Sequence, residues 1–187
     1  MTGISLESIA QGDSRQARRG TAYPVAVIGN LDIRLASQAD AAEIAAMARD
    51  YIERGLPWTW TEARVAFSIA SRETNVVVAR EAGAIVGFGI MSYPHDDAHL
   101  LLFAVRPEYR RRGVGSAMLS LLEGVGRELG MRRIRVECRR DNDAARNFYA
   151  EHGYHELEIH RRMYRGLADG IRLEKWLTDD TGGVESP

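Results

Sequence analysis

Three arginines run directly into a glycine-containing turn in the segment RRRGVG, residues 110–115. The apolar pattern that follows predicts a helix over 113–129, so the turn would form the helix N-terminus. A helix N-terminus presents unpaired backbone N–H groups and a partial positive charge, and glycine lets an anion approach the backbone closely. The segment therefore predicts a pyrophosphate site, although a solvated arginine run beside an ordinary turn fits the same residues. It lacks the GK[ST] ending of a Walker loop and the spacing G-x-G-x-x-G.

The elements that would position this turn follow from the apolar periodicity of the chain. Helices are predicted over 37–55, 61–71, 113–129 and 143–152, and strands over 31–36, 75–81, 84–93, 98–105, 133–139, 154–160 and 171–177. Their order predicts an α/β fold, with a mixed central sheet and helices on both of its faces. The glycine turn would then join a buried strand to a helix.

Three regions are expected along the chain. Residues 1–29 are polar and aperiodic apart from the run YPVAVI, so we expect a flexible N-terminal arm. Residues 30–178 would form one domain, because 187 residues of which 45% are hydrophobic can bury a single core. Residues 179–187 would form a C-terminal tail.

Composition argues against several classes of protein. The net charge of −1 disfavours binding of nucleic acid through bulk charge. No apolar run approaches the roughly 20 residues of a membrane helix, and the first residues lack a secretory signal core, so a cytoplasmic protein is expected. Cys138 is the only cysteine, and the five histidines lack the spacing of a metal site, so neither an internal disulfide nor a bound metal is expected.

Two motifs follow one another along the chain. The pattern V-x-P-x-x-[RQ]-x-x-G-x-[GA] is matched by Val105, Pro107, Arg110, Gly113 and Gly115. The later pattern N-x-x-A-x-x-[FL]-Y-x-x-x-G-[FY] is matched by Asn142, Ala145, Phe148, Tyr149, Gly153 and Tyr154. In this order the two motifs resemble those of the GNAT superfamily of acyl-CoA N-acyltransferases, and the resemblance covers about residues 31–177. It is strongest to the branch that acetylates protein N-termini, including a ribosomal-protein enzyme.

The resemblance implies that acetyl-CoA binds in a cleft between two splayed parallel strands. Pantetheine would pair with the strand backbone before the turn, and the pyrophosphate would lie on the backbone amides of the turn. Asn142 would hydrogen-bond to the pantetheine arm, or it could cap the helix that follows it. The residues that the resemblance assigns to acetyl-CoA are Phe103, Ala104, Val105, Arg110, Arg111, Arg112, Gly113, Val114, Gly115, Ser116 and Asn142.

The implied chemistry requires a base for the amine and an acid for the departing thiolate. Tyr149 lies two helical turns beyond Asn142, so both would face the cofactor, and a tyrosine is protonated at neutral pH. Its alternative role is that of an aromatic core residue. Glu137 lies where related enzymes often have a glutamate proposed as base, and its alternative role is a cross-strand ion pair with arginines. Cys138 lies on the apolar face of its strand and is expected to be inert.

The resemblance places the acceptor beside the loop between the first two helices and the closing hairpin. The candidate acceptor-contacting residues are Trp58, Trp60 and Tyr164, although loop tryptophans also cover core edges and Tyr164 could lie on a surface hairpin.

We expect an N-acetyltransferase, acting as a monomer or homodimer, that transfers acetyl directly to a primary amine such as a protein N-terminal amine. The alternatives are a small amine acceptor and a non-catalytic CoA-binding regulatory module.

Overall fold

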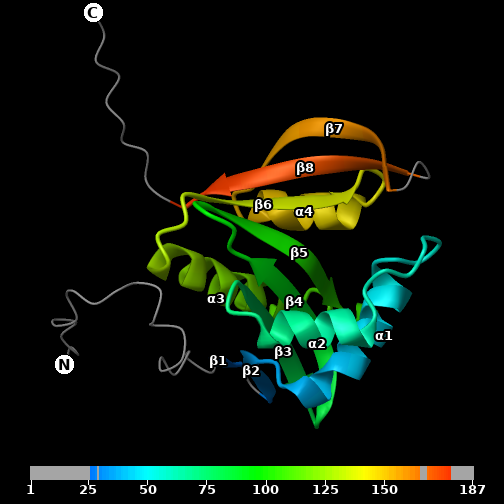
Figure 1. Ribbon diagram of the computed structural model, residues 1–187, viewed down its shortest axis with the longest axis vertical. Coiled ribbons are helices and arrows are strands. Elements are labelled where there is room, and N and C mark those ends of the chain that lie inside the picture. Colours follow the sequence, from blue (N-terminus) through cyan, green and yellow to red (C-terminus); the bar gives the residue numbers. More distant parts are fainter. Residues whose placement is uncertain (1–25, 29, 165–167, 178–187) are drawn as a thin grey trace, which may run out of the picture.

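A mixed sheet runs through the centre of the protein, and its described strands follow the order β1-β2-β3-β4-β5-β6-β8-β7 (Figure 1). The computed structural model describes residues 26–28, 30–164 and 168–177, with side chains described over 30–161 and 169–177. The strands are β1 (Ala26–Ile28), β2 (Leu31–Leu35), β3 (Thr74–Glu81), β4 (Ala84–Ser92), β5 (Asp97–Val105), β6 (Arg133–Arg139), β7 (His155–Tyr164) and β8 (Ala168–Trp176). The helices are α1 (Ala41–Tyr51), α2 (Glu62–Ala70), α3 (Val114–Glu128) and α4 (Asp143–Glu151), with 3-10 turns η2 (Gln38–Asp40) and η3 (Pro107–Tyr109). No helix in these ranges is long and apolar enough to span a membrane.

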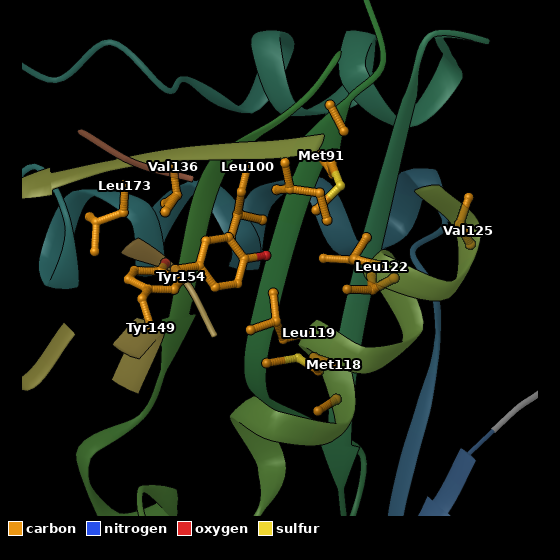
Figure 2. Close-up of a cluster of buried hydrophobic side chains, with 14 of the residues drawn as sticks. Met91, Leu100, Met118, Leu119, Leu122, Val125, Val136, Tyr149, Tyr154 and Leu173 are labelled. Atoms are coloured by element: carbon orange, nitrogen blue, oxygen red, sulfur yellow. The ribbon is translucent and has the colours of Figure 1, made fainter. Parts of the chain in front are cut away.

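Helices cover both faces of the sheet, as the sequence predicts. The alternation of β3 sends Val76 and Val78 into a core shared with α1 and α2, and sends Val77 and Ala79 into a core shared with α3 and α4. Figure 2 shows part of the second core, where side chains of α3 meet those of the sheet. The two cores hold the sheet rigidly between its helices, and the site described below is built on its strand ends.

Strands β5 and β6 are parallel neighbours, and they separate before either strand ends (Figure 1). Their residues pair from Asp97 with Arg133 to Leu100 with Val136. Beyond that point β5 continues to Val105 while β6 continues to Arg139, and these ends do not pair with each other. The predicted pair of splayed parallel strands is therefore confirmed.

A β-bulge at Leu101 lies where the two strands part. On the neighbouring strand β4, Ile90 faces Leu102 and Met91 faces Leu100, so Leu101 is an extra residue in β5. The extra residue reverses the alternation of side chains. Leu100 packs in the core of α3, whereas Leu102 packs in the core of α1 and α2. The bulge thus turns the end of β5 relative to its beginning.

The sheet begins earlier than the sequence analysis expects. Residues 26–28, assigned there to the N-terminal arm, form β1 and pair antiparallel with β2, so the boundary at residue 29 is corrected to 26 at the latest. One feature of the sequence indicates this strand, because the dipeptide Gly-Asn between two apolar runs is typical of a hairpin. The hairpin signal is weak because the strand has only three residues and lies at the sheet edge. Residues 1–25 and the predicted tail, 179–187, lie outside the described residues.

Glycine at position 89 is required by close packing between β4 and its neighbours. A Cβ there would lie 2.9 Å from Cδ2 of Phe103 and 3.0 Å from Cδ1 of Leu122, whereas a Cβ at Gly124 of α3 would meet no atom within 4 Å. We predict that Gly89→Ala lowers the free energy of unfolding by about 1–3 kcal/mol through overpacking. Gly124→Ala should raise it by up to about 1 kcal/mol. Urea unfolding of both variants tests this, and equal effects would contradict the packing.

Candidate active site

A cavity of about 650 Å³ lies between the separated ends of β5 and β6. It is also lined by the turn after β5, the first turn of α3, helix α4 and the residues around the end of α1. The cavity brings together most of the residues predicted from the sequence. Those that line it are Phe103, Ala104, Val105, Arg110, Arg111, Gly113, Gly115, Ser116, Glu137, Asn142 and Tyr149.

The turn before α3 is shaped by two residues with left-handed backbone. Gly113, the N-cap of α3, has a φ of 79°, and Arg111 has a φ of 59°. Arg110 closes the turn, since its Nε donates to the carbonyl oxygen of Val105 at 3.1 Å. The unpaired N–H groups of the first turn of α3 are thereby held at the cavity, in the arrangement that an anion requires.

Two residues of this segment that the resemblance assigns to acetyl-CoA, Arg112 and Val114, do not line the cavity. The side chain of Arg112 does not line the cavity, because it pairs with Glu81 at 3.2 Å and lies over the ring of Tyr109 at 4.7 Å. Val114 is 1% exposed and packs in the core. Successive helical side chains point about 100° apart, so Val114 faces the core while Gly115 and Ser116 face the cavity.

Gly115 lies against an aromatic pair that forms part of the cavity wall. A Cβ at this position would lie 3.1 Å from Cε2 of Phe148, and the ring of Phe148 stacks on Phe103 with 5.7 Å between centroids. His152 ties the two helices together here, since its ring nitrogens contact the carbonyl oxygen of Phe148 at 2.7 Å and the Ser116 hydroxyl at 2.9 Å. No motif or spacing in the sequence indicates this role of His152.

Asn142 lies where either of its two predicted roles would place it. Its Oδ1 accepts a hydrogen bond from the N–H of Ala145 at 3.1 Å, so it caps α4. It also lines the cavity. The cap fixes where α4 begins, and with it the direction in which the helix presents Tyr149.

Tyr149 is 5% exposed and lines the cavity from α4. Its ring meets Phe148 edge-on at 5.4 Å and packs against Tyr154 at 5.4 Å, as Figure 2 shows for the two tyrosines. The residue thus belongs to the core and to the cavity wall at once. A ring held by packing on two sides can present its hydroxyl in a fixed position.

Glu137 lines the cavity from β6 and also forms the cross-strand ion pair that the sequence allowed. Arg172 of β8 donates to its Oε1 from Nε at 3.1 Å and from Nη2 at 2.9 Å. Within the described residues, the other oxygen, Oε2, receives no hydrogen bond. Arg172 also pairs with Glu158 at 2.8 Å, so two carboxylates share one guanidinium.

Cys138 is 8% exposed and lines the cavity beside Glu137. Burial raises the pKa of its thiol to about 11. The thiol therefore stays protonated, and a poor nucleophile, across the neutral range. The expectation of an inert cysteine agrees with this environment. Within the described ranges, no three histidine, cysteine, aspartate or glutamate side chains are grouped closely enough to hold a metal ion.

The predicted acceptor residues of the loop between α1 and α2 do not line the cavity. Trp60 is 8% exposed and packs in the core of α1 and α2, and Trp58 donates from its ring nitrogen to the carbonyl oxygen of Trp60 at 2.9 Å. Buried Glu53 organises this loop by accepting hydrogen bonds from the backbone of Thr59 and Trp60. Residues just before the loop line the cavity instead: Tyr51, Ile52 and Arg54. Tyr164 lies in β7, and its side chain is outside the described residues.

Comparison with known proteins shows which family the chain matches. Residues 43–154 match the acetyltransferase (GNAT) family. The [ribosomal protein bS18]-alanine N-acetyltransferase of Escherichia coli is 31% identical over 118 residues, which are 63% of this chain and 78% of that protein. The N-alpha-acetyltransferase RimI of Mycobacterium tuberculosis is 32% identical over 110 residues, 57% of this chain and 68% of that protein. The crystal structure of Ard1 from Thermoplasma volcanium superposes with a TM-score of 0.70 at 28% identity, over 80% of this chain and 99% of that one.

The chain belongs to the acetyltransferase (GNAT) family. It is an acyltransferase whose acetyl donor is acetyl-CoA, and the fold is that of the family's solved structures. The residues present fit this donor, because the unpaired backbone of β5 and the N–H groups at the start of α3 open into one cavity.

We predict that Cys138→Ala keeps turnover within about twofold of the wild type, because a thiol with a raised pKa forms no acyl intermediate at neutral pH. The folded wild type should also resist iodoacetamide at pH 8, with labelling that rises only as the pH approaches 11. Mass spectrometry follows the labelling, and urea-unfolded protein provides the control that reacts. A Cys138→Ala variant without activity would point to a covalent route.

Proposed function

We propose that this protein transfers the acetyl group of acetyl-CoA directly to a protein N-terminal amine within a ternary complex. The observation that carries the proposal is the single cavity between β5 and β6, which is lined by the turn before α3 and also by Glu137 and Tyr149. Donor and acceptor can therefore meet in one space, between a carboxylate from β6 and a phenol from α4.

The donor lies along the end of β5. Residues 103–105 pair with β4 on one side and with no strand on the other, where β6 leaves a gap. Pantetheine contains amide groups that can take these hydrogen bonds, and buried backbone groups require such partners. The pyrophosphate then reaches the backbone N–H groups that begin α3, with Arg110 and Arg111 beside it.

The transfer needs two proton movements in opposite directions. The amine nitrogen attacks the thioester carbon with its lone pair, and the carbon–sulfur bond breaks. Glu137 takes a proton from the amine, directly or through a water molecule, while Tyr149 gives its proton to the departing thiolate. The products are the N-acetylated acceptor and free CoA. Cys138 takes no part, because burial keeps its thiol protonated.

A protein N-terminus is favoured as acceptor by two observations. The relatives named above include two enzymes described as acetylating an alanine of a ribosomal protein or an N-alpha amine. The acceptor end of the cavity is also open to solvent, since Tyr51 is 36% and Leu101 is 41% exposed. A chain that continues beyond its first residue can leave the cavity there.

A screen of short peptides against small amines, read by release of free CoA, tests this preference for a protein N-terminus. Turnover of small amines alone would contradict the preference.

We predict that Tyr149→Phe lowers kcat by about 10², the lower end of general-acid effects, because a thiolate is already a tolerable leaving group. The affinity for acetyl-CoA should stay within about twofold, since the ring and its packing against Phe148 and Tyr154 are kept. Turnover is measured over a pH series, and acetyl-CoA binding by calorimetry. Turnover within twofold of the wild type across the series would remove Tyr149 from the chemistry.

We predict that Glu137→Gln lowers turnover most at low pH and least near pH 9. An N-terminal amine, with an ordinary pKa near 8, is mostly protonated at pH 6 and needs a base, whereas at pH 9 it is mostly neutral. The loss at pH 6 should exceed the loss at pH 9 by about tenfold or more. Glu158→Gln is the matched control, because it removes the other carboxylate bound to Arg172 without touching the cavity. Equal pH profiles for the two variants would reduce Glu137 to an ion-pair residue.

A further inference from the structure

Two arginines line the cavity at its acceptor end. Arg54 follows the end of α1, and Arg139 is the last residue of β6. The guanidinium of Arg139 donates from Nη1 to the backbone carbonyl oxygen of Arg54 at 3.4 Å, which joins segments 85 residues apart in the chain. The two side chains therefore start from neighbouring points on the wall.

The charges of these arginines are poorly compensated by the rest of the wall. The lining carboxylates are Glu137 and Glu151, which are paired with Arg172 and Arg111. Arg139 pairs at 3.3 Å with Asp141, but the Asp141 side chain is 74% exposed, and an ion pair so open to water is weak and readily exchanged. Within the described residues, the guanidinium of Arg54 forms no ion pair. This end of the cavity therefore favours an anionic group.

The spacing along β6 gives the position of that anion relative to the amine. Glu137 and Arg139 are two residues apart on one strand, so they project from the same face with about 6.6 Å between their backbone positions. Consider an extended peptide whose amine lies at Glu137. Its second residue lies one residue spacing, roughly 3.5 Å, beyond the first. A carboxylate on that second side chain can reach Arg139 and Arg54.

We infer that Arg54 and Arg139 select an acceptor that carries a carboxylate close to its amine, in the form of an N-terminus with Asp or Glu as its second residue. The inference rests on the proposed function and adds the substrate class to it. The same carboxylate chemistry could come from the α-carboxylate of a free amino acid, and the experiment separates these two sources.

The experiment compares matched acceptors with the full chain. Peptides that begin Ala-Asp and Ala-Asn, otherwise identical, are assayed for kcat/KM together with free alanine and alanine amide. The wild type should prefer the Ala-Asp peptide by about tenfold or more, the size of one charge-assisted hydrogen bond. In Arg54→Gln and Arg139→Gln the ratio of kcat/KM for the two peptides should fall toward one. The change should come mainly from a higher KM for the Ala-Asp peptide, while KM for acetyl-CoA stays unchanged. Arg139→Lys, which keeps the charge, should retain part of the preference.

Arg140→Gln is the control, because Arg140 is next in sequence to Arg139, pairs with Asp169 at 3.9 Å and does not line the cavity. The Arg140→Gln variant should prefer the Ala-Asp peptide over the Ala-Asn peptide as strongly as the wild type does. Efficient turnover of both peptides without a preference overturns the inference and leaves N-terminal acetylation intact. The wild type could instead acetylate free alanine but neither peptide nor alanine amide, with this activity lost in Arg139→Gln. That result supports recognition of a carboxylate and overturns the peptide acceptor.

Discussion

The site depends on one interruption of backbone pairing, the end of the ladder between β5 and β6 after Leu100 and Val136. If the pairing continued, the two strands would close the cavity and satisfy each other's backbone groups. The bulge at Leu101 turns the end of β5, and on the side of β6 the separated strand keeps a row of N–H and C=O groups that no other strand pairs with. We propose that the amide groups of pantetheine satisfy part of that row, so the open ladder would be both a cost in the free protein and a binding surface for the donor.

A short stretch of chain then brings a carboxylate and a phenol to this gap. Strand β6 presents Glu137 at the cavity, Asn142 caps the following helix, and α4 presents Tyr149 from the other side. Two cores on opposite faces of the sheet hold these elements, so the distance between carboxylate and phenol is set by rigid packing. In our proposal the acceptor enters beside Arg54 and Arg139, which line the cavity.

Local motifs made the cavity wall around the turn before α3 predictable from sequence. The glycine turn and the asparagine cap depend on backbone conformation, so their residue types and spacing reveal them. The bulge at Leu101 was not predictable, because the run LLLFAV is apolar toward both faces and shows no change of alternation. The sequence left the role of the loop tryptophans open for a similar reason. A tryptophan is equally suited to a core edge and to a ligand, and only packing sends Trp60 into the core.

Amide hydrogen exchange with and without acetyl-CoA tests whether the donor binds in the gap between β5 and β6. We expect new protection in two segments, residues 101–105 on the open side of β5 and residues 113–116 at the start of α3. Strand β3, which is paired on both sides, should show no change. Gly115→Val, which would press on Phe148, should lose this protection at the same acetyl-CoA concentration, whereas Gly124→Val on the same helix should keep it. Protection confined to other segments would contradict the account, because the donor would then bind outside the gap between β5 and β6.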